Sequence, residues 1–308
     1  MAALFALAAP DHPFTALDFR TIAVQTVIVA TVACGMTLVI ISGGLDLSVG
    51  SSVALTTVVT ATVLTSPSLQ GATPLVRSMV AITAAIGTGT LCGIYNGGLI
   101  TLLKLPPFIV TLGTLGFFRG VSKWISGNSP IQTDPAGLDL WVRPMTTFSW
   151  TPVAPAVWVM MLVAVGIAGL LRFTVLGRQA IAIGSNEEAA RRCAVPMNKV
   201  KLIVYSIAGA LVGLAGLAQF ARLGGSGDPT VQVGLELKAI AAVVIGGASL
   251  AGGSGSIVGT IAGAFLMAML DNRCTALGWP NYVQEIVVGH IIIFAVALDR
   301  WRSRRPVG

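Results

Sequence analysis

The chain has 308 residues, of which 55% are hydrophobic and only 10% are charged. Soluble globular proteins carry about 25% charged residues, so lipid must be the solvent for most of this surface. The net charge of +7 does not indicate nucleic-acid binding, because the basic residues gather beside apolar runs, as expected for the cytoplasmic flanks of membrane spans.

Taken from its N-terminus, the chain opens with the short apolar segment MAALFALAAP. This segment lacks the basic region of a cleavable signal peptide. We expect it to be the remnant of a first spanning helix, which is either shortened or begins upstream.

Apolar runs of about 20 residues, enough to cross a hydrocarbon core of about 30 Å, recur along nearly the whole length. They predict a single all-α domain over residues 1–308, a polytopic transmembrane helical bundle with about nine or ten spans. Two runs near residues 237–270 are short and interrupted by ASLAGGSGS, which predicts a helix pair, or broken or half-helices near the centre that line a protected cavity. The predicted spans are 22–41, 47–64, 79–103, 108–125, 155–171, 202–221, 237–250, 257–270 and 283–298.

Charge predicts the orientation of these spans. The basic segment 172–201 and the arginine-rich tail after residue 299 should be cytoplasmic, because positive residues stay on that side of the membrane. By alternation, the loop 127–150 and the loop around Asp228 should face outward.

Small residues recur every four positions within several predicted spans. Such spacing places them on one helix face, where they allow close helix packing within the chain or, alternatively, in a dimer. The sets are Ala85, Gly89, Gly93 and Gly97; Gly209 and Gly213; and Gly255, Gly259 and Gly263.

The stretch GMTLVIISGGLDLSVGSSVAL contains a lone carboxylate, Asp46, beside a Gly43-Gly44 break between two apolar runs. A charge there is costly unless it is paired or hydrated. Asp46 and Ser48 could cap the following helix, or they could line a polar path through the bundle together with Ser42.

A second set of polar residues lies in later spans. Asn96, Thr111 and Arg119 could face the bundle interior and hydrogen-bond a substrate, although threonine often bonds its own helix and asparagine can join neighbouring helices. Glu236 begins the apolar run ELKAIAAVVIGG and completes the candidate path.

The cytoplasmic segment at about 173–201 contains a short polar helix, NEEAARR, between Gly184 and Pro196. An N-cap, acids in the first turn and bases in the last turn are typical of an ordered helix rather than a merely solvated loop. The segment therefore favours docking to a soluble partner. Its residues are Asn186, Glu187, Glu188, Ala189, Arg191 and Arg192.

Four stretches together resemble the ribose-type permeases of bacterial ABC sugar importers, in the same order and over almost the whole chain: GMTLVIISGGLDLSVGS, PPFIVTLGTLGFFRGVS, AIGSNEEAARRCAVPMNKVK and ELKAIAAVVIGGASLAGGSGSIVGT. The resemblance implies a permease subunit that moves a monosaccharide into the cytoplasm across the bacterial inner membrane. It implies a dimer with a second copy or a paralogue, a periplasmic sugar-binding protein, and an ABC ATPase that carries ATP and Mg²⁺. NEEAARR would then be the coupling helix.

One departure concerns Lys238, which stands where that family usually has an acid. Lys238 could pair with Glu236, or it could change the lining of the pore.

Other classes fit the sequence less well. The chain has no GxxxxGK[ST] motif for ATP hydrolysis, and no catalytic dyad or GxSxG elbow that would indicate a membrane enzyme. Its four cysteines lack the spacing of a metal site or disulfide framework. The alternative is an ion-coupled secondary transporter, for which the candidate ionisable residues are Asp46, Glu236, Glu285 and His290.

Overall fold

The structure is a computed structural model that describes residues 16–69, 71–142 and 153–303. Within these ranges the chain forms eleven α-helices. Five of them are long and apolar enough to cross a membrane, which confirms the prediction of an all-helical, multi-pass membrane protein. These five are α2 (Ala16–Ile41), α4 (Pro74–Leu102), α6 (Pro155–Phe173), α9 (Met197–Arg222) and α11 (Ile257–Ala276).

All nine predicted apolar runs are helical, whereas the opening segment lies outside the described residues. α10 has 11 residues, about 16 Å, and is a half-helix, whereas α11 with 20 residues is full length. α7 was not predicted. The remaining elements are α3 (Val49–Leu64), α5 (Pro107–Ser126), α7 (Val175–Ser185), α8 (Glu187–Arg192), α10 (Leu235–Ile245), α12 (Asn281–Ser303), the short 3-10 helices Pro67–Leu69 and Leu138–Trp141, and the strands β1 (Ile131–Gln132) and β2 (Ser226–Gly227).

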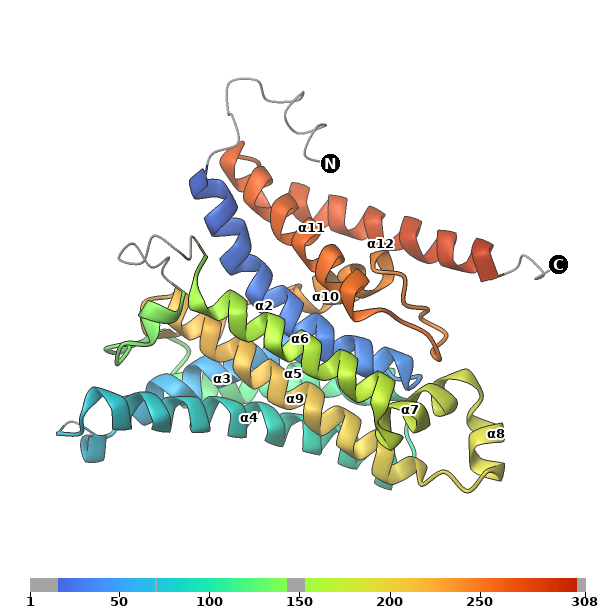
Figure 1. The fold of residues 1–308 in the computed structure, drawn as a ribbon. Helices are drawn as coiled ribbons and strands as arrows, with labels where there is room; N and C mark the ends of the chain where they lie inside the picture. The colour runs from blue at the N-terminus through green and yellow to red at the C-terminus, as the bar shows by residue number, and fades with distance from the viewer. Residues whose placement is uncertain (1–15, 70, 143–152, 304–308) are drawn as a thin grey trace.

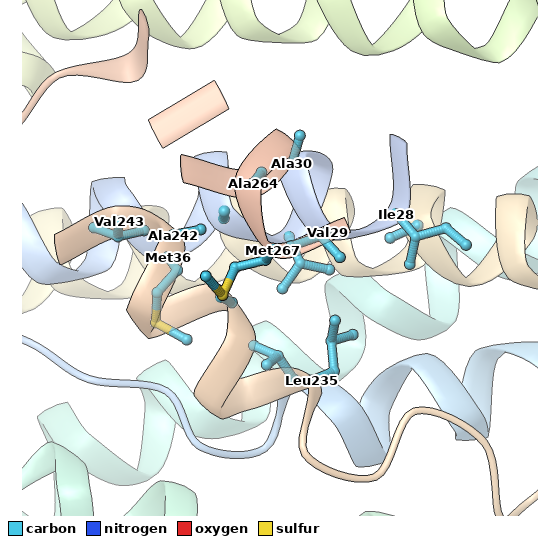
Figure 2. Packing of buried hydrophobic residues seen from close by; sticks show 14 of the residues in the cluster. Ile28, Val29, Ala30, Met36, Leu235, Ala242, Val243, Ala264 and Met267 are labelled. Atoms are coloured by element: carbon cyan, nitrogen blue, oxygen red, sulfur yellow. The ribbon is translucent and has the colours of Figure 1, made fainter. Parts of the chain in front are cut away.

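α2 lies at the centre of the bundle and contacts α6, α9, α10 and α11. Residues 26–41 are all buried, as expected for a helix that is apolar around its whole circumference. Figure 2 shows side chains of α2 in one cluster with side chains of α10 and α11, among them several alanines, valines and methionines. The half-helix α10 is therefore held directly against the central helix.

Glycines bring pairs of helices into close contact. A Cβ at Gly93 of α4 would overlap the carbonyl oxygen of Tyr205 in α9, and one at Gly209 would overlap that of Gly89. In the same way Gly259 and Gly263 of α11 lie against the backbone of α10. The small-residue stripes thus serve packing within the chain, as predicted.

The basic segment 172–201 lies at one end of the bundle. α7 and α8 lie together there (Figure 1), and the positive-inside pattern predicts that this end is cytoplasmic. At the other end β1 pairs with β2 antiparallel, with Ile131 opposite Gly227. Arg77 also binds Asp134 there at 2.6 Å, and this hydrogen bond holds the pKa of the exposed Asp134 carboxyl below its usual value. Residues 143–150 of the predicted outer loop, and the tail after 303, lie outside the described ranges.

Candidate functional site

The break between α2 and α3, residues 42–48, is held by hydrogen bonds from other helices. Gly43 has a φ of +77°, a conformation that glycine adopts without cost. Both the Tyr205 hydroxyl of α9 and the Thr111 hydroxyl of α5 donate to the carbonyl oxygen of Leu45, at 3.1 and 3.2 Å. Two helices, α5 and α9, are therefore joined to the break at one carbonyl.

Asp46 lies inside this break and is only 5% exposed. Its Oδ1 accepts hydrogen bonds from the backbone N–H and the hydroxyl of Ser48, at 2.8 and 2.7 Å. Asn96 of α4 donates to the Ser48 hydroxyl at 2.8 Å and to Asp46 Oδ2 at 3.4 Å. Ser48 is the N-cap residue of α3 but makes no side-chain cap bond. Asp46 thus orders the start of α3 from two residues away, as an Asx turn does.

The other residues predicted for the path also make bonds within the protein. Ser42 donates to the Val39 carbonyl of its own helix at 2.8 Å. Arg119 donates to the carbonyl oxygens of Pro229 and Val231, at 2.7 and 2.8 Å, and so positions the loop that leads to α10. A role for these residues as substrate ligands stays a prediction.

A polar cavity of about 680 Å³ opens towards the outer end, where α10 begins. Glu236 is the one predicted path residue that lines it. Sequence reasoning also names Lys238 and Glu285, but it misses the other lining residues, although glutamine inside an apolar span was a usable signal. The polar lining residues are Gln25, Gln219, Arg222, Gln232, Glu236, Lys238, Asp271, Thr275, Gln284 and Glu285.

The charges in this outer cavity are nearly balanced, with two cations and three carboxylates among its lining residues. Lys238 binds Asp271 at 2.6 Å and thereby joins α10 to α11. The expected pairing of Lys238 with Glu236 is therefore wrong, because the side chain reaches across to α11 instead. Lys238 nevertheless lines the cavity, which was the other expectation.

Amide groups complete the wall of the outer cavity. Gln232 donates to Gln219 at 2.8 Å. The Gln25 amide, oriented to satisfy both neighbours, accepts from Arg222 and donates to the Ala268 carbonyl, each at 3.2 Å. Amides and paired charges offer donors and acceptors without a strong field of one sign, which suits a neutral polar solute better than an ion.

The predicted cytoplasmic helix is present as α8. Asn186 is its N-cap and accepts from the Ala189 N–H at 2.9 Å, as predicted. Glu188 pairs with Arg192 at 3.2 Å, and Lys201 of α9 pairs with Glu187 at 3.1 Å. Apart from the buried Ala190, the helix is exposed, so its charged surface is free to meet a partner.

Close glycine contacts join α8 to the bundle. The Gly253 N–H donates to the carbonyl oxygen of Ile41, the last residue of α2, at 2.9 Å. A Cβ at Gly184, at the end of α7, would overlap that same Ile41 oxygen and lie 2.6 Å from the Gly253 nitrogen. The segment before α8 therefore touches both the end of α2 and the loop between α10 and α11.

Comparison with known proteins places the chain in a family of permeases. Residues 19–296 match the family described as branched-chain amino acid transport system / permease component. The chain is 40% identical to the ribose import permease protein RbsC of Escherichia coli (strain K12), over 93% of this chain and 86% of that protein. It is 39% identical to the protein of the same name from Bacillus subtilis (strain 168), over 91% and 83%.

A relative named for a different substrate is the autoinducer 2 import system permease protein LsrC of Yersinia pseudotuberculosis (serotype O:3, strain YPIII). The two are 34% identical over 93% of this chain and 78% of that protein. No solved structure matches the chain.

Proposed function

Since this chain belongs to the family of branched-chain amino acid transport system permease components, we propose that it is the membrane-spanning subunit of an ABC importer that moves a small sugar into the cytoplasm. The chain itself is a non-catalytic transport subunit. ATP and Mg²⁺ would be held by a separate ABC ATPase, and the membrane would be the bacterial inner membrane.

The proposed substrate class is supported by the outer cavity and by two relatives named for ribose import. A monosaccharide presents hydroxyl groups that both donate and accept hydrogen bonds. Glutamine amides and paired charges provide complementary partners, and about 680 Å³ is within the usual size of small-molecule sites. Such sites in transporters lie where a helix is discontinuous, as at the start of α10.

The observation that carries the proposal is the contact between the end of α7, directly before α8, and the loop that joins α10 to α11. Both of these helices line the outer cavity, and Gly184 and Gly253 place their connection against the segment before α8. A movement of α8 would therefore shift α10 and α11 relative to α2. This gives an ATPase docked on α8 a direct mechanical route to the substrate.

The proposed cycle is alternating access. A sugar-loaded periplasmic binding protein docks on the outer loops, the ATPases close on the cytoplasmic side, and the cavity changes its access from outside to inside. A second permease, either a copy or a paralogue, would complete the assembly. Substrate contacts in the cavity should be weak, because a conducting site must release what it admits.

The proposal is tested by purifying the chain from native membranes in mild detergent and identifying the proteins that accompany it. We expect a P-loop ATPase whose activity rises when a sugar-loaded binding protein is added. A chain that purifies alone, and moves sugar in liposomes under an ion gradient, would contradict the proposal and establish an ion-coupled secondary transporter.

A further inference from the structure

A second cavity, of about 760 Å³, lies at the cytoplasmic end of the bundle. Its walls are the loop between α4 and α5, one side of α8, and the first turn of α9. Four cations line it, Lys104, Arg191, Lys199 and Lys201, but only one carboxylate, Glu187. The cavity thus carries a formal charge of about +3, which fits an anion.

The one carboxylate in this basic cavity is already neutralised. Lys201 lies 3.1 Å from Glu187, and Arg191 lies 3.8 Å from the same oxygen. In the described part of the chain, Lys104 and Lys199 form no ion pair. Two ammonium groups therefore remain available to a ligand.

Lys104 occupies an unfavourable backbone conformation, with a φ of +53°. Glycine or asparagine adopts this left-handed region more readily than lysine does. A non-glycine residue kept in such a conformation is a reason to look for a role of its side chain. The backbone conformation of this position would favour glycine or asparagine. The residue is nevertheless Lys104, whose side chain lines the basic cavity.

The surface beside the basic cavity is apolar and exposed. Leu102 is 81% exposed, and Leu103, Leu105, Phe108 and Ile109 are 42 to 58% exposed. In a membrane protein such side chains face acyl chains rather than water. The four cations therefore sit where lipid-facing surface meets the cytoplasm, a place where basic clusters bind anionic lipid headgroups.

We propose that the basic cavity binds one anionic phospholipid of the cytoplasmic leaflet. The phosphate would contact Lys104 and Lys199, and the acyl chains would lie along the apolar surface formed by Leu102, Leu105 and their neighbours. A soluble ATPase bound on α8 would match the charges but not the apolar surface. The bound lipid would tie the α4–α5 loop to the start of α9, immediately beside α8. This inference needs only the orientation of the chain in the membrane, not its transport activity.

The test measures lipid binding to the delipidated full-length chain by native mass spectrometry, with phosphatidylglycerol and phosphatidylethanolamine as probes. We expect one phosphatidylglycerol to bind in clear preference to phosphatidylethanolamine. Each cation near a charged lipid contributes about a fivefold gain in affinity, so Lys104→Gln with Lys199→Gln should weaken that binding about 25-fold. The matched control is Arg172→Gln with Arg178→Gln, which removes two cations from the same end outside the basic cavity and should leave the preference unchanged.

Any one of four results would overturn the inference. The Lys104 and Lys199 variant could retain the full lipid preference, or the Arg172 and Arg178 control could lose as much. Displacement of the lipid by millimolar glycerol phosphate would show that the cavity serves a soluble phosphate. A double variant that keeps the lipid but no longer retains the ATPase would identify a protein-docking surface. The wild-type protein and the variants should have equal melting temperatures, which would show that a loss of lipid binding is not caused by misfolding.

Discussion

At the scale of single residues, the polar side chains within the bundle fall into two groups with different surroundings. Asp46, Asn96 and Ser48 bond one another in the interior, whereas Glu236 and Lys238 line the outer cavity. The sequence marks both groups in the same way, as polar residues within apolar runs. Only the three-dimensional structure distinguishes residues that bond one another from residues that line a cavity.

The first prediction concerns Asp46. Asp46→Asn keeps an oxygen that can accept from Ser48, and it removes a buried charge as well as a charge-assisted bond, so the free energy of unfolding should change by no more than about 1 kcal/mol. Asp46→Ala leaves the Ser48 N–H and the Asn96 amide without that acceptor and should cost about 1–3 kcal/mol. Thermal melting in detergent measures both. Sugar uptake should survive in the asparagine variant, and a stable variant without uptake would instead place Asp46 in the path or gate.

The second prediction concerns the Lys238–Asp271 pair, whose side chains are 25% and 20% exposed. Lys238→Gln leaves Asp271 without its nearest cation and should lower stability by about 1–3 kcal/mol and reduce sugar uptake. The exchange Lys238→Asp with Asp271→Lys should restore much of both, because the pair forms again in reverse. Lys123→Gln, an exposed lysine, is the control. An exchange that rescues nothing would show that the pair is not what joins α10 to α11.

At the scale of elements, hydrophobic run length predicts the helices well because lipid leaves a chain few alternatives. α7 escaped prediction because its 11 residues include Arg178 and Gln179 and begin three positions after Arg172, so the segment is typical of a cytoplasmic loop. The end of α11 at Ala276 was also missed, since Asp271, Asn272 and Arg273 interrupt the apolar run. Packing against neighbouring helices extends the helix through these polar residues.

The third prediction compares substitutions at two glycines of α4. A Cβ at Gly93 would overlap the Tyr205 carbonyl, but one at Gly98 would meet nothing within 4 Å. Gly93→Ala should force α4 away from α9 and destabilise the protein by about 1–3 kcal/mol. Gly98→Ala should be neutral or slightly stabilising, because alanine favours the helix. Thermal melting compares the two, and equal effects would argue against close α4–α9 contact.

At the scale of the whole molecule, the sequence predicts the membrane fold and the cytoplasmic helix better than the cavity. α8 can be predicted because its N-cap, Asn186, and its charged residues lie within a few positions of one another in the sequence. The outer cavity combines residues as distant in the chain as Gln25 and Glu285. No spacing rule brings them together, so the structure was needed to place Glu236 in one cavity with Gln219 and Arg222 rather than with Asp46.

The last prediction tests the route from α8 to the outer cavity. Charge reversal at Glu187, Glu188, Arg191 and Arg192 should weaken docking of the ATPase itself, since it alters the exposed surface of α8. Gly184→Ala acts differently, because its Cβ would push the end of α7 away from Ile41 and Gly253 without changing that surface. We expect the ATPase to remain bound and active while the sugar moved per ATP hydrolysed falls several-fold.

Reconstitution with the ATPase and the binding protein measures this ratio directly. Gly169→Ala in α6, where a Cβ would meet nothing within 4 Å, is the matched control and should leave the ratio unchanged. If Gly184→Ala also preserved the ratio, motion would have to reach α10 by another route. The direct contact of α9 with α8 would then be the next candidate, because Lys201 of α9 binds Glu187 of α8 and α9 carries Gln219 and Arg222 to the cavity.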